Sequence, residues 1–164
     1  MLIDELLLIE PINEGWSDDK KYHAKDKNGN SYFLRVSDIS KYDEKLSEFN
    51  MMKKVESLGV PMCRPVEFGT CGEGVYSVQT WINGENAEEI IFNFSEKEQY
   101  NYGIDAGRIL KKIHSIPAPD DQEDWAIRFN RKIDRKIKKY SECPLKYENS
   151  EAFLEYIAEN RRLL

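Results

Sequence analysis

The sequence predicts an α+β fold, in which an antiparallel sheet crossed by one helix is followed by a run of helices. Two observations predict it. Short runs rich in β-branched and aromatic residues, separated by glycine-containing turns, fill the first part of the chain. Longer stretches with apolar residues at helical spacing follow. We therefore predict two domains, a sheet domain over residues 1–92 and a helical domain over residues 93–164.

Charge and hydropathy exclude several classes of protein. The chain has 164 residues and a formal net charge of −6, which disfavours non-specific binding to nucleic acid. We find no basic leader and no apolar stretch of the roughly 18 residues that a membrane-spanning helix needs. The sequence therefore predicts a cytoplasmic protein with no membrane or nucleic-acid partner. Cys63, Cys71 and Cys143 fit no disulfide framework and are expected to be free thiols.

The predicted sheet consists of one strand and two hairpins. The first strand is expected at residues 6–9, and a hairpin at residues 22–25 and 32–36, about a turn that contains Gly29. A second hairpin is expected from residues 65–69 and 75–82.

One helix should lie across this sheet, over residues 43–58. Gly59 and Pro61 supply its stop signal. Its apolar side chains recur every three residues: Leu46, Phe49, Met52 and Val55.

Three helices are predicted in the second domain. Ser95 and Glu98 form a capping box that begins the first, which should run to about His114. Apolar residues at every fourth position predict a second helix over residues 125–137. The third should begin near Ser150 and run to the chain end.

A cation and a carboxylate stand out as a candidate site. Arg35 lies in a predicted strand, and Glu48 lies thirteen residues later on the helix that should cross it, so the two side chains can meet. A cation that binds phosphate needs a partner that holds its flexible side chain in place. An ordinary surface ion pair is the alternative that the spacing alone leaves open.

Several segments in this order resemble the aminoglycoside phosphotransferase family, whose members share the protein-kinase fold. They are residues 14–17, 32–35, 48–61, 76–85 and 106–114. The resemblance implies a protein-kinase-like N-lobe, followed by the first helices of an incomplete helical C-lobe. It also implies a kinase that uses ATP or GTP on a small molecule, as antibiotic-resistance enzymes do. Arg35 would bind the nucleotide phosphates, and Glu48 would be its helix partner.

The resemblance also implies the remaining nucleotide contacts. Gly15 and Ser17 would lie in a loop over the phosphates, although an ordinary turn is the alternative at Gly15. The Thr80 carbonyl and the Ile82 N–H would hold the base, with Gln79 beside it as gatekeeper. The alternative for this segment is a strand end followed by a tight turn.

The catalytic parts of such a kinase are missing from the sequence. The family places its catalytic Asp in a His-Gly-Asp loop, but neither His23 nor His114 is followed by Gly-Asp. We read His23 as an exposed strand residue and His114 as structural. We reject Asp105-Ala106-Gly107 as a metal motif, and read the acidic residues 120–124 as a solvated loop. We therefore assign no catalytic or metal-binding residue, expect Mg²⁺ only in a complete enzyme, and expect this chain alone to be inactive.

Two functions of different class remain. The first is ATP- or GTP-dependent phosphoryl transfer to a hydroxyl of a small molecule, with this chain as the nucleotide-binding portion. The second is a non-catalytic nucleotide-binding or interaction module with a shortened kinase fold. Apolar side chains on the later helices lack a predicted cover, so we also expect a homo-oligomer formed through the helical surface.

Overall fold

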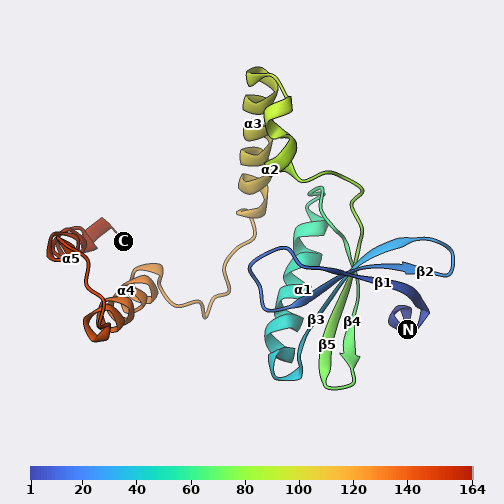
Figure 1. Cartoon of the computed structure of the whole chain (residues 1–164), viewed down its shortest axis with the longest axis horizontal. Coiled ribbons are helices and arrows are strands. Elements are labelled where there is room, and N and C mark those ends of the chain that lie inside the picture. Colours follow the sequence, from blue (N-terminus) through green and yellow to red (C-terminus); the bar gives the residue numbers. More distant parts are fainter. Residues whose placement is uncertain (164) are drawn as a thin grey trace. The chain divides into compact units, whose positions relative to one another are not determined.

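The computed structural model describes residues 1–163 and divides the chain into two compact units (Figure 1). The first unit is Met1–Pro117, and the second begins at Ala118. The predicted boundary after residue 92 marks the change from strands to helices, whereas the two units are separated by their compactness in space. The predicted boundary therefore stays a prediction.

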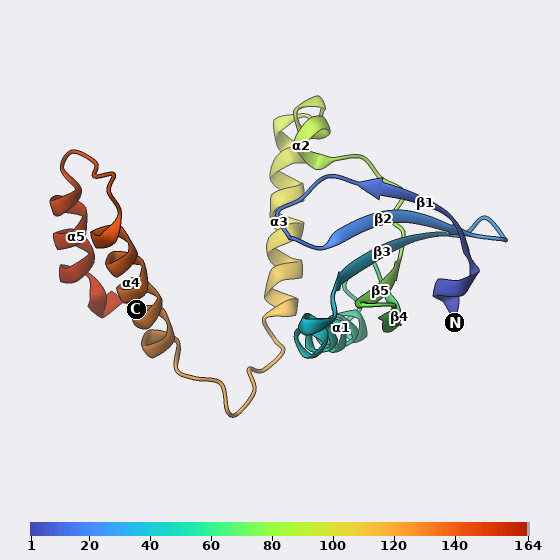
Figure 2. The ribbon, with the colours of Figure 1, turned by 60° about the horizontal axis from the view of Figure 1, so that its bottom comes forward.

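The first unit is built on a curled antiparallel sheet with the strand order β1-β2-β3-β5-β4 (Figure 2). The strands are β1 (Leu6–Ile12), β2 (Lys20–Asp26), β3 (Ser31–Asp38), β4 (Pro65–Cys71) and β5 (Gly74–Thr80). Both predicted hairpins form, β2 with β3 and β4 with β5. The non-consecutive neighbours are β3 and β5, which pair from Tyr32 opposite Thr80 to Asp38 opposite Gly74. The expected α+β fold is confirmed.

Helix α1 (Tyr42–Ser57) lies between β3 and β4 in the sequence and packs against the sheet, as predicted. Its buried Phe49 packs against Phe68 of β4, with ring centroids 5.4 Å apart, and Tyr42 meets the same ring at 5.5 Å. Gly59 follows the helix with a φ of 66°, a left-handed conformation that glycine adopts without strain. The apolar face seen in the sequence therefore anchors the helix to the sheet.

The core of the sheet is a cluster of five buried residues: Leu6, Ala24, Leu34, Tyr76 and Val78. At its edge, the Tyr76 hydroxyl donates to Glu67 Oε1 at 2.6 Å. The other oxygen of Glu67 accepts from the Leu2 N–H at 2.7 Å, which fixes the short 3-10 helix η1 (Leu2–Glu5) beside the core. One carboxylate thus joins the N-terminus to the centre of the sheet.

Gly69 faces the buried ring of Tyr76 so closely that a side chain has no room. A Cβ atom at Gly69 would lie 2.8 Å from the Tyr76 hydroxyl oxygen and 3.0 Å from two ring carbons. We expect Gly69→Ala to lower the free energy of unfolding by about 1–3 kcal/mol, because the enclosed ring must move. Urea unfolding measures this. The control is Gly103→Ala on α3, where nothing lies within 4 Å, and we expect that change to stabilise. Equal effects at both positions would contradict the steric argument.

Helices follow the sheet, again largely as predicted. Two short elements that the sequence did not predict, α2 (Ala87–Ile90) and η3 (Ile91–Asn93), precede α3 (Glu96–Ile113). The predicted capping box is confirmed: the Ser95 N–H donates to Glu98 Oε2 at 2.9 Å, and the Glu98 N–H donates to Ser95 Oγ at 3.4 Å.

The second unit is an antiparallel hairpin of α4 (Trp125–Glu142) and α5 (Ser150–Glu159) (Figure 2). Arg161 ties the two together by donating to Asn130 Oδ1 at 2.7 Å and to Asp134 Oδ1 at 2.5 Å, both on α4. The last helix was predicted to run to the chain end, and this is wrong. A separate 3-10 helix, η4 (Arg161–Leu163), follows α5 and positions Arg161 for these contacts.

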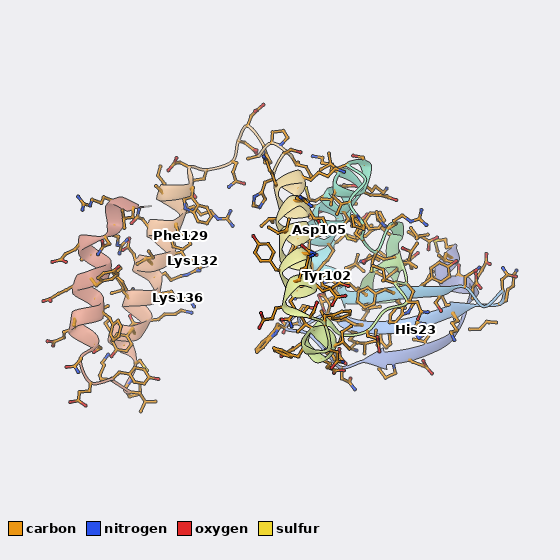
Figure 3. All side chains as sticks on the ribbon, turned by 90° about the horizontal axis from the view of Figure 1, so that it is seen from above. His23, Tyr102, Asp105, Phe129, Lys132 and Lys136 are labelled. Carbon is orange, nitrogen blue, oxygen red and sulfur yellow. The ribbon has the colours of Figure 1, made fainter. Side chains whose placement is uncertain are left out.

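Apolar side chains remain exposed on both helices of the second unit. Trp125 and Phe129 stack with ring centroids 4.9 Å apart, and Lys132 lies over the Phe129 ring (Figure 3). Trp125, Phe153 and Tyr156 are each more than half exposed. Self-association through these helices stays a prediction. Among the described helices, none is long and apolar enough to cross a membrane.

Candidate functional site

The polar groups that the sequence singled out gather in the first unit, where α1 faces the sheet. A small cavity of about 20 Å³ lies there, lined by side chains from both. Its polar side chains include Asp19, Arg35, Lys45 and Glu48, and Phe68 contributes to its apolar wall. Such a volume holds about one water molecule.

Arg35 lies in the middle of β3, opposite Lys21 of β2 and Ser77 of β5. Alternation along the strand places its side chain on the face opposite that of Leu34, which is buried in the core. The guanidinium Nη2 binds Asp19 Oδ2, and the side chain remains 28% exposed. The sheet therefore fixes the backbone of this cation while leaving part of its head accessible.

Asp19 precedes β2 and is the most enclosed acid of the site, with its side chain 2% exposed. Its Oδ1 accepts from Ser37 Oγ at 2.7 Å, and its Oδ2 accepts from Lys45 Nζ at 3.2 Å as well as from Arg35. Burial alone would raise the pKa of Asp19, but the hydrogen bonds of Ser37 and Arg35 and the two cations outweigh it and lower the pKa from 3.8 to about 2. The carboxylate is therefore firmly ionised.

The direct pair of Arg35 with Glu48, which the spacing predicted, is replaced by a chain of contacts. Glu48 Oε2 accepts from Lys45 Nζ at 3.0 Å, three residues earlier on α1, and no ion pair joins Glu48 to Arg35 within residues 1–163. Lys45 sits between Asp19 and Glu48. Although burial opposes its charge, the hydrogen bonds to Glu48 and Asp19 raise the pKa of Lys45. Arg35 and Glu48 therefore line one cavity, but they are connected only through Asp19 and Lys45.

The loop with Gly15 and Ser17 joins β1 to β2. Gly15 has a φ of 93°, which favours glycine, and a Cβ atom there would lie 3.2 Å from Lys21 Nζ. Lys21 Nζ donates to the carbonyl oxygens of Glu14 at 3.0 Å and Ser17 at 3.4 Å. A cation from β2 thus holds the loop, and the loop's Trp16 side chain is fully exposed.

The predicted base-binding segment lies at the end of β5. Gln79 is buried and lines the same cavity as Arg35. The Thr80 side chain and N–H both bond to Arg64, each at 2.9 Å. Ile82 is 55% exposed, and its N–H has no hydrogen-bond partner within the part of the chain that the structure describes. This backbone donor is therefore available to a ligand.

His23 was predicted to be an exposed strand residue, and this is wrong. Its side chain, labelled in Figure 3, is 20% exposed. Its ring lies 4.2 Å from that of Trp81. Nδ1 lies 3.4 Å from Glu10 Oε2, and Nε2 lies 3.1 Å from Ser31 Oγ. Trp81 follows β5 and folds back on the sheet, which local sequence did not indicate.

Sequence reasoning also missed Asp19, Ser37 and Lys45. Two signals were present: Ser37 is two residues from Arg35 on one strand, and Lys45 is three residues from Glu48 on one helix. Nothing local marked Asp19, because its partners lie 16 to 26 residues away. Within residues 1–163, no group of three or more His, Cys, Asp or Glu side chains is placed to hold a metal ion.

Comparison with known proteins gives one family. The model of the family described as the phosphotransferase enzyme family matches residues 8–164, beginning within β1. Comparison with curated proteins gave no match.

Proposed function

The chain belongs to the phosphotransferase enzyme family, and from this premise we propose that it is the ATP- or GTP-binding portion of a kinase that phosphorylates a hydroxyl of a small molecule. The family match confirms the resemblance inferred from the sequence. The observation that carries the nucleotide-binding proposal is the convergence of Arg35 and Lys45 on one carboxylate oxygen, at a partly open cavity. Two cations aimed at one oxygen suit a phosphate group.

In this proposal the remaining site residues orient the nucleotide. Backbone N–H groups near Gly15 and the Ser17 hydroxyl would bind phosphate oxygens. The Thr80 carbonyl and the Ile82 N–H would hold the base, and Gln79 would lie beside it. Glu48 would act indirectly, because it holds Lys45 in place.

Transfer of the phosphoryl group needs more than these residues. Mg²⁺, when bound in a complete enzyme, would neutralise charge on the phosphate oxygens. The sequence contains no His-Gly-Asp, so we propose the transfer step only for a protein that also supplies a catalytic base and metal ligands. For the 164-residue chain alone, we propose nucleotide binding without turnover.

We expect Arg35→Ala to weaken ATP binding by roughly ten- to a hundredfold, the loss typical of a charge-assisted hydrogen bond to phosphate. Isothermal titration calorimetry of the 164-residue chain with ATP and with GTP, in the presence of Mg²⁺, measures it. The matched control is Arg108→Ala, the same substitution at an exposed arginine on α3 that pairs with Asp105. Well-folded wild-type protein that shows no saturable binding would contradict the proposal.

A second candidate is a non-catalytic nucleotide-binding or interaction module, because the cluster of Arg35, Lys45 and Asp19 could bind phosphate without any catalytic group. The two candidates differ in turnover and not in binding. Saturable ATP binding with no release or transfer of the γ-phosphate supports the module for this chain, whereas detectable turnover supports the enzyme.

A further inference from the structure

We propose that Asp19 is an internal competitor of the nucleotide: its carboxylate occupies the phosphate position between Arg35 and Lys45, and a bound phosphate must displace it. This inference rests on the proposed function. It concerns the contacts that hold the site closed, which neither the family match nor the sequence pattern assigns.

The Asp19 carboxylate is bound as a small oxyanion would be. Arg35 and Lys45 converge on Oδ2, and the Ser37 hydroxyl donates to Oδ1 at 2.7 Å. The three donors come from β3 and α1, which follow each other in the sequence, whereas Asp19 lies 16 to 26 residues before them. Two cations and a hydroxyl are also the donors that proteins use for a phosphate group.

The space that remains does not admit a phosphate group. With Asp19 in place the cavity measures about 20 Å³, room for about one water molecule. The Lys45 side chain is 14% exposed, so a ligand reaches it only after the carboxylate moves. Arg35, at 28% exposed, offers an incoming anion its first contact.

The loop that carries Asp19 is the one that the resemblance places over the phosphates. Asp19 lies four residues after Gly15 and directly before β2. Lys21 holds the loop by the carbonyls of Glu14 and Ser17, through exposed contacts that can be exchanged for water. Moving Asp19 therefore means moving the loop, which would couple phosphate binding to loop position.

A different role for Asp19 makes the opposite prediction. If the carboxylate only positions Arg35 for phosphate, removing it loosens the cation and weakens binding. If it competes with phosphate, removing it vacates the position and strengthens binding. The sign of the change in affinity therefore decides between them.

The test compares the wild-type chain with Asp19→Asn, using ATP and inorganic tripolyphosphate as calorimetric probes. We expect Asp19→Asn to bind both probes roughly tenfold tighter or more, the size of one charge-assisted hydrogen bond that no longer has to be broken. The gain should vanish in Asp19→Asn combined with Arg35→Ala. Asp18→Asn is the charge-matched control, because Asp18 is 96% exposed. Asp19→Ser is a second variant, and circular dichroism checks that each protein is folded.

Each outcome decides something. Equal or weaker binding by Asp19→Asn overturns the inference, and leaves the proposed function intact if wild-type protein binds ATP. A gain that persists without Arg35 also overturns it. Tighter binding of tripolyphosphate, with ATP bound no better than tripolyphosphate, supports the anion site and contradicts the nucleotide function. Failure of both chains to bind either probe overturns both proposals.

Discussion

Replacing Tyr76 by alanine should lower the free energy of unfolding of the first unit by about 3–5 kcal/mol, the usual cost of deleting a buried aromatic ring. The ring is 1% exposed and packs with Leu34 and Val78 at the centre of the sheet. Because α1 and the loops are attached to this sheet, we expect the site to be lost with it. Urea unfolding followed by tryptophan fluorescence and circular dichroism measures the change.

Tyr76→Phe separates the ring from its hydroxyl. The hydroxyl donates to Glu67 at 2.6 Å. Burial is the main cause that raises the pKa of Tyr76, and this hydrogen bond raises it further. Removing it leaves Glu67 with the N–H groups of Leu2 and Ile3, so we expect a smaller loss of about 1–3 kcal/mol. If both variants lost the same amount, the packing of the ring would contribute nothing and the prediction would be wrong.

The elements of this fold follow from local sequence, but their arrangement does not. The glycine-containing turn between β2 and β3, the apolar face of α1 and the capping box at Ser95 act over a few residues, and all were predicted. The sequence did not predict that β3 lies beside β5, because the order of strands depends on contacts between distant segments. The short α2 has too few residues for a periodic signal.

The residues of the candidate site also fall into those that local sequence predicts and those that only distant contacts bring together. Arg35 and Glu48 were found because each lies on an element that the local sequence predicts, and both line one cavity. The ion pair between them was predicted from spacing alone, and spacing cannot show that Lys45 reaches Glu48 first. Asp19 lies on no periodic element, so only the folded chain shows that it meets Arg35.

The first unit should become less stable in acid, and Asp19 should contribute about 2 kcal/mol to that loss. Its pKa is about 2 in the folded chain and 3.8 when unperturbed. A carboxylate with a lowered pKa stabilises the fold above the unfolded value, and loses that contribution as the pH falls through the folded value. The window for Asp19 therefore runs from about pH 5 down to about pH 2. Lys45 and Arg35 are the charged groups that contact it, and Glu48 contacts Lys45.

Asp19→Asn isolates this contribution, because a protonated aspartate and an asparagine are both neutral. The free energy of unfolding of wild-type protein should exceed that of the variant by about 2 kcal/mol at pH 7, and the difference should close by about pH 2. Other carboxylates with lowered pKa values, such as Asp26 and Glu67, titrate in both proteins and cancel. Urea unfolding at a series of pH values measures the difference. A difference that stays constant with pH would mean that the charge of Asp19 does not hold the cluster together. The other outcome is that the difference in the free energy of unfolding closes in acid while Asp19→Asn binds ATP more tightly. The contacts of Asp19 would then both stabilise the free protein and oppose its ligand.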